Sequence, residues 1–541
     1  LLKDDEVIAE ALLNENSEDI EYSFNPEQPI KLEKEVKGPW GLKLNLPKSE
    51  TTLEVQPNGL DCEKGTIKFK GSKKILGKSL AKEDCLIKEE FDFTKSTKKS
   101  LLSQAREWVS GERTIPTTIV QLLERDSIPE LIQVNEKIQK DLPNINSYIS
   151  DFIFNNDERL IAIQGPPGTG KTTLSSKIIA ELVQKGYRVA ITANSHRVIN
   201  NLLLKIDTHF QNLNINQLIV KCDYIEDEIF LDSNVRTLPP RKIRDYVSVM
   251  GATTNKFCNK EFDSSFDLLV VDEAGQYSLA NLLTIAKHSK SILLVGDTQQ
   301  LAMPTKASHP NHSGQSCLQY LMNGLEVVPT NKGIFLPISW RMAPPINDVV
   351  SELFYQGKLK ANNNNSGNKI IWNKASIKKD TSIYSDAGVI FVPVRHQDCS
   401  LKSEEEAEKI QEIIQLLLSS KYRLGTNKEK PITSEDILLL APFNTQVNYL
   451  KRKFNENIKI GTVDLFQGEE AIISIFSLTS SSGDEAPRGL DFLLEPNRLN
   501  VAISRAKVLS IIVGSPSLAE SLCKTTEEAK KLNRFCRLLN D

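Results

Sequence analysis

The chain has 541 residues, of which 40% are hydrophobic and 25% charged, and its formal net charge is −3. These values are those of an ordinary globular protein and exclude a disordered or generally basic chain. Because one hydrophobic core rarely grows beyond roughly 250–300 residues, we expect three to four domains. Any surface that binds nucleic acid must then be a local groove.

Cysteine and histidine usage argues against a structural metal site. The 8 cysteines are scattered with no Cys-x-x-Cys pair, and the 6 histidines do not cluster at metal-ligand spacing. This pattern is typical of reduced thiols in a cytoplasmic protein. No apolar run approaches the roughly 20 residues that a membrane-spanning helix needs, and no signal peptide is visible. The chain begins without Met, which favours a piece of a longer protein.

The first part of the chain, residues 1–95, predicts a small β-barrel-like domain with a leading helix. Residues 1–20 look amphipathic and helical, and short alternating runs follow from Tyr22 to Phe93. The turn signal Pro57-Asn58-Gly59 lies between two of these runs. The clearest runs are residues 30–33, 53–55, 66–70 and 85–87. Residues 96–158 return to helical periodicity and predict a helical stalk.

From residue 159 onward, apolar strands alternate with helices, which predicts parallel sheets covered on both faces. We place one α/β unit at residues 159–330 and a second at 331–541. The polar tract from Asn362 to Gly367 is interpreted as a surface loop of the second unit. The strand candidates are residues 188–191, 268–271, 292–295, 389–392, 437–440, 472–477 and 509–513.

One segment predicts a phosphate-binding loop: Gly165, Pro166, Pro167, Gly168, Thr169, Gly170, Lys171 and Thr172. It follows an apolar run and precedes a helical stretch from Thr173, which is the strand–loop–helix context of such loops. The glycines let successive backbone N–H groups point at phosphate oxygens. Lys171 can reach the β and γ phosphates, and the Thr172 hydroxyl can ligate Mg²⁺. The segment therefore predicts a nucleoside triphosphate site.

Paired acids, Asp272 and Glu273, end an apolar strand downstream. In a nucleotide hydrolase the first acid holds the Mg²⁺ hydration shell, and the second orients and deprotonates the attacking water. Either acid alone would be a routine strand-end carboxylate. The polar cluster from Asp297 to Gln300 ends the next strand and suits a γ-phosphate sensor, although a simple turn has the same composition.

Arginines in the second unit are candidates for neutralising the charge that develops on a transferring phosphoryl group. Arg341 follows the aromatic Trp340, and Arg498 and Arg505 are about two helical turns apart, which predicts one shared helix face. Singly, each arginine is more often a surface ion pair. Their order and the dense polar loop 461–469 favour the phosphate role.

The order of these segments resembles superfamily 1 helicases of subgroup B, the group of the nonsense-mediated-decay RNA helicase and the Okazaki-fragment nuclease–helicase. The matching stretches are GPPGTGKT, VVDEAGQ, GDTQQL, LPISWRM, GTVDLFQGEE and NRLNVAISRA, between Leu160 and Gly514. The resemblance implies an α/β fold with two RecA-like motor lobes, a nucleotide site for ATP and Mg²⁺, and an accessory barrel before the first lobe.

The resemblance also implies residue roles. Lys171 and Thr172 would bind phosphate and Mg²⁺, Asp272 would organise the metal, and Glu273 would be the general base. Gln300 would sense the γ-phosphate, and Arg341 and Arg505 would be the two arginine fingers. Trp340 would stack on the adenine, and Glu469 would help position the ribose. Trp340 could also be a core tryptophan. One departure stands out: Tyr148 occupies the position of the usual adenine-reading glutamine, so strict ATP preference is in doubt.

Residues 193–202, 278–281 and 486–493 resemble more narrowly the helicase half of fusions with a RecB-like nuclease. This resemblance implies a nuclease domain encoded upstream. Residues 1–150 show no carboxylate–lysine centre of that kind, so the chain is expected to be the motor portion only.

Small polar groups at predicted strand ends are candidates for contacting a single strand along its phosphates. Each could also be an ordinary turn or helix cap, and Phe443 could stack on a base or fill the core. The candidates are Asn194, Ser195, His196, Thr253, Thr254, Pro442, Asn444 and Thr462.

The expected function is that of an ATP-driven, monomeric helicase moving 5′→3′ on single-stranded nucleic acid, with DNA favoured over RNA. A nucleic-acid-stimulated regulatory clamp and an RNA helicase are the alternatives. A small-molecule kinase is nearly excluded, since it would need no second lobe with paired arginines.

Overall fold

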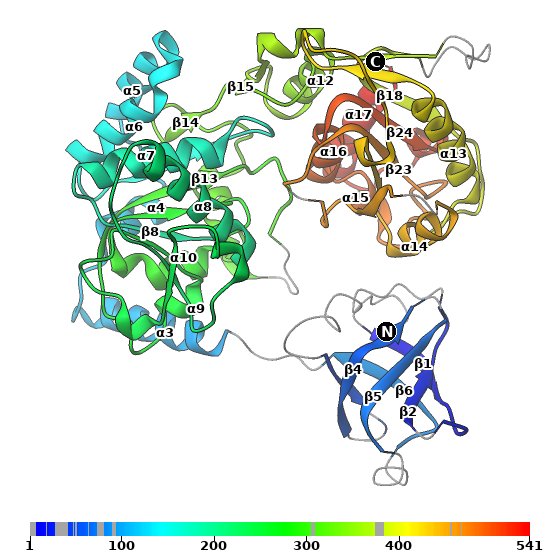
Figure 1. Ribbon diagram of the computed structural model, residues 1–541, viewed down its shortest axis with the longest axis horizontal. Coiled ribbons are helices and arrows are strands. Elements are labelled where there is room, and N and C mark those ends of the chain that lie inside the picture. The colour runs from blue at the N-terminus through cyan, green and yellow to red at the C-terminus, as the bar shows by residue number, and fades with distance from the viewer. Residues whose placement is uncertain are drawn as a thin grey trace.

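The computed structural model describes residues 7–17, 19–26, 42–46, 48, 51–62, 64–72, 80–88, 94–303, 309–373, 384–454, 457–466 and 468–540. Its main elements are a closed β-barrel, an eight-stranded sheet and a five-stranded sheet, and helices flank both sheets (Figure 1). The expected α/β fold, with two parallel-sheet lobes after a barrel, is confirmed. No helix in the described ranges is both long and apolar enough to cross a membrane.

The barrel has the strand order β1-β2-β5-β4-β3-β6, with antiparallel neighbours. The expected leading helix is wrong, because this segment is β1, which pairs with β6. Its register shifts between Ile8 and Ala11, and both side chains are fully buried. This bulge gives the three-residue apolar spacing that resembled a helix. The strands are β1 (Val7–Leu13), β2 (Asp19–Ser23), β3 (Lys43–Leu46), β4 (Thr51–Asp61), β5 (Thr66–Ser72) and β6 (Glu83–Lys88).

The Pro57-Asn58-Gly59 signal also differs from the expectation. These residues lie inside β4 and not between strands. The register with β5 shifts between Val55 and Leu60, and Asn58 has φ 58°. The signal is therefore a bulge, which bends one barrel strand without ending it. The expected run 30–33 lies outside the described residues.

The first lobe is built on an all-parallel sheet with the order β10-β9-β11-β8-β12-β13-β7-β14. Its central strands are continuous apolar runs because helices cover both faces. The strands are β7 (Leu160–Gln164), β8 (Val189–Thr192), β9 (Ile219–Cys222), β10 (Arg236–Leu238), β11 (Val249–Gly251), β12 (Phe266–Val271), β13 (Ser289–Gly296) and β14 (Gly333–Phe335). The helices are α7 (Lys171–Gln184), α8 (His196–Asn212), α9 (Thr254–Phe257), α10 (Leu279–Ile285) and α11 (Cys317–Met322).

The helices expected in residues 96–158 are present and pack directly on this lobe, sharing its cores. Gln104 Nε2 donates to Thr284 O at 2.7 Å, and Gln121 Oε1 accepts from Leu160 N at 2.9 Å. The first sheet also continues to β14, beyond the boundary drawn at residue 330. The helices are α3 (Lys95–Ser110), α4 (Thr117–Glu124), α5 (Glu130–Lys140) and α6 (Ile145–Asn155).

The second lobe has a parallel sheet with the order β18-β24-β23-β21-β22. Smaller pairings add β15 (Ile338–Ser339) with β16 (Lys360–Ala361), and β17 (Lys369–Ile371) with β19 (Lys421–Arg423) and β20 (Lys430–Pro431). The sheet strands are β18 (Gly388–Pro393), β21 (Ile437–Ala441), β22 (Lys459–Thr462), β23 (Ala471–Ser477) and β24 (Ala506–Gly514). The helices are α12 (Pro344–Phe354), α13 (Glu404–Leu418), α14 (Asn444–Lys453), α15 (Gly489–Leu493), α16 (Pro496–Ser504) and α17 (Thr526–Asn540).

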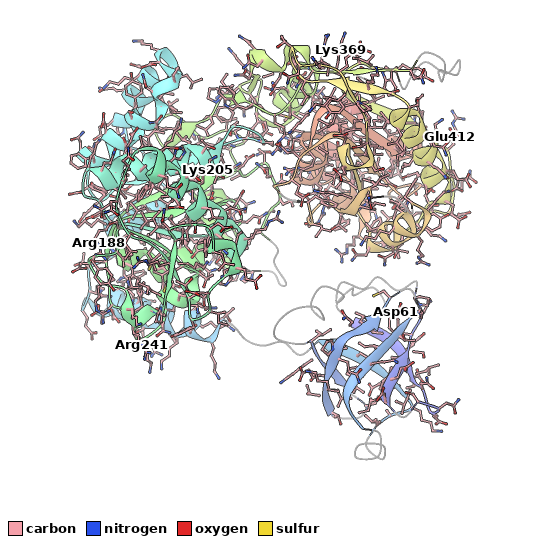
Figure 2. All side chains as sticks on the ribbon, viewed as in Figure 1. Asp61, Arg188, Lys205, Arg241, Lys369 and Glu412 are labelled. Atoms are coloured by element: carbon pink, nitrogen blue, oxygen red, sulfur yellow. The ribbon has the colours of Figure 1, made fainter. Side chains whose placement is uncertain are left out.

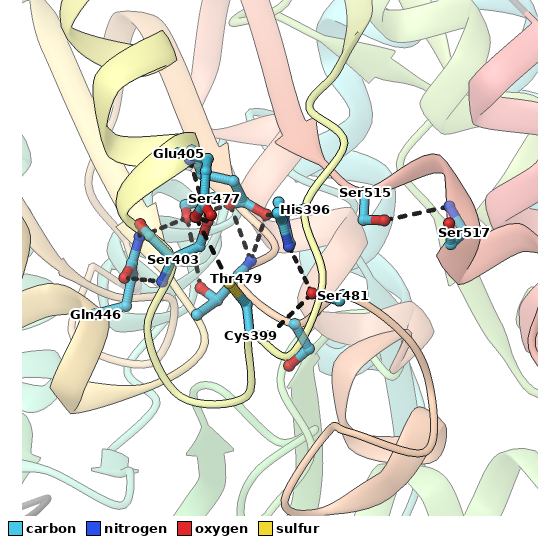
Figure 3. A network of polar contacts seen from close by, with 12 residues as sticks. His396, Cys399, Ser403, Glu405, Gln446, Ser477, Thr479, Ser481, Ser515 and Ser517 are labelled. Carbon is cyan, nitrogen blue, oxygen red and sulfur yellow. Dashed lines mark hydrogen bonds and ion pairs between the residues drawn. The ribbon is translucent and has the colours of Figure 1, made fainter.

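Charged side chains cover the outer helices of both lobes, and Lys205 on α8 and Glu412 on α13 are exposed examples (Figure 2). The interior of the second lobe instead contains a buried polar network (Figure 3). His396 Nε2 lies 3.0 Å from Glu406 Oε1, and its Nδ1 lies 2.7 Å from Ser481 Oγ. Glu406 also accepts from Thr479 N at 2.9 Å. These bonds hold the loop after β23 at the carboxyl edge of the sheet.

Candidate active site

The predicted phosphate loop joins β7 to α7, as its sequence context requires. Gly168 and Gly170 have φ 73° and 80°, in the left-handed region that glycine adopts without strain. A Cβ on Gly165 would lie 2.3 Å from Lys171 Cγ. Lys171 Nζ donates to Gly165 O at 2.6 Å. The loop is thus wound around the lysine, and the glycines leave room for that winding.

A cavity of about 1040 Å³ lies between this loop and the second lobe. Residues 167–173 line it from the first lobe, together with Glu273 and Gln300. From the second lobe come Arg341 and Arg505. The two lobes approach closely here, because a Cβ on Gly168 would lie 2.5 Å from Arg341 Cβ. The structure therefore brings the predicted lysine, general base and two arginines to one cavity.

The paired acids lie at the carboxyl end of β12, beside the phosphate loop. Asp272 is 3% exposed, and it accepts a hydrogen bond from Glu273 N at 3.0 Å. Glu273 has φ 52°, a strained backbone conformation of the kind found at functional sites. Burial and the neighbouring Glu273 raise the pKa of Asp272 to about 7, which Lys171 opposes.

The same carboxylate fits a magnesium site. No salt bridge within the described residues engages Asp272, so its buried charge is not neutralised by a contacting basic side chain. A divalent cation would supply the missing charge. Thr172 lines the cavity at the start of α7 and provides the hydroxyl that the loop is expected to contribute.

Both predicted arginine fingers are held by specific contacts. Arg341 Nε lies 2.9 Å from Glu470 Oε2, and its Nη1 donates to Ser504 O at 3.1 Å. Arg505 is 1% exposed and donates through Nη1 to Glu469 O at 3.0 Å. Burial lowers the pKa of Arg505 to about 9, so this guanidinium remains charged at neutral pH. Two fixed positive charges thus face the phosphate loop.

Glu469 and Arg498 do not line the cavity, contrary to expectation. The Glu469 carboxylate turns to Lys459 Nζ, 2.8 Å away on β22, and its neighbour Glu470 lines the cavity instead. Arg498 stacks over the Phe492 ring at 3.9 Å. Arg505 caps α16 with helical backbone angles and its Nε donates to Val501 O at 3.1 Å, and it lines the cavity whereas Arg498 does not.

Gln300 and Trp340 line the cavity as predicted, whereas Tyr148 does not. Trp340 is 61% exposed, and its backbone N donates to Gly168 O at 2.8 Å. Gln300 Nε2 donates to Asp297 Oδ2 at 2.9 Å. The Tyr148 hydroxyl donates to Asp141 Oδ2 at 3.0 Å, which raises the pKa of Tyr148. Trp340 therefore offers an open aromatic face next to the phosphate loop.

A buried bridge between the lobes was not predicted. The Tyr355 hydroxyl, just after α12, donates to Asp297 Oδ2 at 2.6 Å. The same hydroxyl accepts from Asn500 Nδ2 at 2.9 Å, and that amide also reaches Gln299 O at 2.7 Å. Burial raises the pKa of the Tyr355 hydroxyl well above its usual range. Asp297 Oδ2 therefore accepts hydrogen bonds from both the Tyr355 hydroxyl and the Gln300 amide.

The first-lobe candidates for nucleic acid lie at the carboxyl ends of β8 and β11. The Asn194 amide donates to Gln276 O, and Ser195 caps α8 by accepting from Val198 N at 3.3 Å. His196 is exposed. Thr253 precedes α9, but the Thr254 hydroxyl is buried against Tyr277 OH at 2.7 Å.

Thr254 therefore has a structural contact in place of the expected phosphate contact.

The second-lobe candidates lie at the ends of β21 and β22. Pro442 and Asn444 are partly exposed, and so is Thr462. Phe443 is 6% exposed and stacks on Phe492 with ring centroids 5.7 Å apart, so it fills the core.

Across the lobes, Arg197 Nη2 at the start of α8 lies 3.8 Å from Glu469 Oε1. The carboxyl edges of the two sheets thus approach each other.

The chain is similar to known helicases over most of its length. Residues 150–309 and 314–517 match two families, each described as an AAA domain. The DNA replication ATP-dependent helicase/nuclease DNA2 of Saccharomyces cerevisiae is 27% identical over 397 residues, which cover 66% of this chain and 25% of that protein. The uncharacterized ATP-dependent helicase MJ0104 of Methanocaldococcus jannaschii is 28% identical over 421 residues, covering 74% and 56%.

A third relative is the ATP-dependent helicase NAM7 of Saccharomyces cerevisiae, which is 24% identical over 479 residues. The match covers 78% of this chain and 46% of that protein. The chain thus spans between a quarter and somewhat more than half of the length of these three relatives.

Proposed function

Because the chain belongs to subgroup B of the superfamily 1 helicases, we propose that it is an ATP-dependent helicase. The observation that carries this proposal is the shared cavity, with Lys171 and Glu273 on one wall and Arg341 and Arg505 on the other. A triphosphate bound there contacts both lobes at once. Its binding therefore favours a closed arrangement, and its hydrolysis removes the contacts that hold the arrangement closed.

In this proposal the first lobe carries out the hydrolysis. Lys171 and the loop N–H groups bind the phosphates, and Glu273 orients a water molecule and accepts its proton. Thr172 and Asp272 would hold Mg²⁺, which offsets the phosphate charge when bound. Arg341 and Arg505 stabilise the charge that develops during phosphoryl transfer, an effect worth about 10³–10⁵ in rate for an arginine finger.

The single strand is proposed to lie along the carboxyl edges of the two sheets. Ser195, His196 and Thr253 would contact it from the first lobe, and Asn444 and Thr462 from the second. The contact between Arg197 and Glu469 supports a continuous track, because it joins the two edges. Alternating grip by the two lobes then converts each hydrolysis cycle into movement.

We further propose 5′→3′ movement and a preference for DNA over RNA, acting as a monomer with a nuclease domain encoded upstream. The direction follows from subgroup B. The printed name of the yeast relative, a DNA replication helicase/nuclease, supports DNA and the nuclease partner.

The test combines ATPase and strand-displacement assays. ATP hydrolysis should rise at least about tenfold with single-stranded DNA, and duplexes with a 5′ overhang should be unwound faster than those with a 3′ overhang. Equal ATPase rates with and without nucleic acid would refute the motor. Stimulated hydrolysis without strand displacement would indicate a regulatory clamp.

A further inference from the structure

Asparagine side chains gather on the second-lobe wall of the nucleotide cavity. Asn363–Gly367 form a short 3₁₀ turn, and this turn, Asn368 and the loop 424–427 line the cavity. The turn starts beside Trp340, because β15 and β16 run parallel with Ser339 opposite Ala361. Asn362 N donates to Ser339 O at 2.8 Å, so the two strands end together. The expected surface loop is thus part of the nucleotide site.

Three asparagines at a spacing of three hold this turn in place. Asn362 Oδ1 accepts from Asn364 N at 3.0 Å, and Asn365 Nδ2 donates to Met342 O at 3.1 Å. Asn368 Oδ1 accepts from Gly425 N at 2.7 Å. Asn362 and Asn368 flank the turn and Asn365 lies within it, so these three side chains fix the turn at both ends and in its middle.

The other three asparagines on this wall have side-chain amides without a hydrogen-bond partner among the described residues. The side chains of Asn363 and Asn364 are exposed, and their amides make no hydrogen bond to a described residue. Asn427 in the adjacent loop is also exposed, and its amide has no such partner. The two segments touch, since a Cβ on Gly367 would lie 2.3 Å from Gly425 O. Three uncommitted amides therefore share one wall with the Trp340 ring.

Among the described residues that line the cavity, the first lobe offers no uncommitted amide. In the segment where subgroup B helicases usually carry a glutamine, the Tyr148 hydroxyl is bound to Asp141. The neighbouring Asn146 and Ser147 side chains both donate to Glu181. The cavity-lining Gln300 amide donates to Asp297. The uncommitted amides among the described cavity-lining residues thus come from the second lobe.

We propose that the nucleotide base is read by the second lobe, with the Asn363, Asn364 and Asn427 amides hydrogen bonding its edge. This inference rests on the nucleotide site of the proposed function. A primary amide carries two donors and one acceptor, so it can pair with either the adenine or the guanine edge. Because these amides are free to rotate, the site accepts both purines. The specificity constants kcat/KM for ATP and GTP are expected to differ by less than about tenfold.

The first experiment removes the amides. The doubly substituted chain N363A/N364A and the variant Asn427→Ala are compared with Asn212→Ala, an exposed asparagine at the end of α8. ATP, GTP and inorganic tripolyphosphate are the substrates, in the presence of single-stranded DNA. The KM for ATP and GTP should rise about tenfold with kcat nearly unchanged, because a ground-state contact is lost. Tripolyphosphate has no base, so its hydrolysis should not change.

The second experiment reverses the hydrogen-bonding character. The Watson–Crick edge of guanine carries two adjacent N–H donors, N1–H and N2–H₂, whereas that of adenine carries one donor, N6–H₂, and one acceptor, N1. In Asn363→Asp, Asn364→Asp and Asn427→Asp, a carboxylate replaces the amide and can only accept. At least one variant should shift the GTP-to-ATP ratio of kcat/KM towards GTP by about tenfold. A merely structural role of these residues would not move this ratio.

The proposal is overturned if all variants keep the wild-type KM and nucleotide ratio, or if tripolyphosphate hydrolysis falls in parallel with ATP hydrolysis. Equilibrium binding of fluorescent ATP and GTP analogues separates this outcome from failure of the motor. Base reading stands if wild-type chain binds both nucleotides and the variants lose affinity, even without DNA-stimulated hydrolysis. Absence of any nucleotide binding by the wild-type chain would refute both proposals.

Discussion

The two walls of the nucleotide cavity are built in different ways. The first lobe contributes one continuous loop and two strand ends, whereas the second lobe contributes segments as far apart in sequence as Trp340 and Lys507. The first wall holds the groups that bind phosphate and attack it. The second holds the arginines and the uncommitted amides. We infer that binding of the phosphates depends mainly on the first wall, and that fast hydrolysis requires the second to be in place.

The largest effect is expected from the first wall. Glu273→Gln removes the general base, so hydrolysis should fall by about a thousandfold or more while ATP binding persists. Lys171→Ala should abolish hydrolysis by weakening binding itself. Measuring ATPase rates together with equilibrium binding distinguishes the two. Full loss of ATP binding in Glu273→Gln would contradict the assignment of roles.

The next effect tests the second wall. Arg341→Lys keeps the charge but loses the planar guanidinium that pairs with Glu470 and reaches Ser504 O. The kcat should fall by about 10²–10³ while the affinity for ATP changes only a few-fold. Lys409→Arg on the outer helix α13 serves as the reciprocal control and should change neither value. A drop in affinity as large as the drop in kcat would mean that the second wall is part of the binding site proper.

A smaller effect is expected where the two walls are linked. Tyr355→Phe removes the hydroxyl that joins Asp297 to Asn500. The basal ATPase should remain, but stimulation by single-stranded DNA should fall by about tenfold, because the buried bridge keeps the Asn500 contact with Gln299 O but loses its contact with Asp297. Tyr246→Phe, at an exposed tyrosine of the first lobe, is the control. If basal and stimulated rates fall equally, Tyr355 acts on the chemistry and not on coupling.

The lobes should also differ in acid sensitivity, and this effect is the smallest. In the first lobe, burial and the positive charges of Lys287 and Arg113 lower the pKa of His288 to about 4. The unfolded chain therefore binds a proton near pH 6.5 that the folded lobe refuses, and stability is lost as the pH falls from about 6.5 to about 4.

His288→Gln should remove about 2 kcal/mol of the loss in unfolding free energy between pH 7 and pH 5, as measured by urea denaturation. His312→Gln, at an exposed histidine of the same lobe, should leave the loss unchanged.

The two walls also differ in how many of their functional residues could be predicted from the sequence. The phosphate loop is one continuous segment, and the two acids are neighbours at the end of β12, so their chemistry could be predicted from local sequence and its strand context. Arg341 and Arg505 were found through the order of segments. Tyr355 and Asn363 gave no local signal, because their roles arise only when α12 and the β15–β16 pair bring distant segments to the cavity.

Two predictions were wrong because they depended on side-chain directions that the sequence does not show. Glu469 was chosen where Glu470 lines the cavity, since a sequence does not show which of two neighbouring acids faces inward. The apolar spacing of Ile8 and Ala11 resembled a helix because a bulge in β1 mimics that period.

The most direct test of the central claim is the distance between the lobes as nucleotide binds. Spin labels can be placed at Lys205 on α8 and Glu412 on α13, both exposed on outer helices (Figure 2). A non-hydrolysable ATP analogue should shorten and narrow the distance distribution, ADP should widen it again, and Lys171→Ala should abolish the response. A distribution that is the same with and without nucleotide would contradict a triphosphate gripped by both lobes.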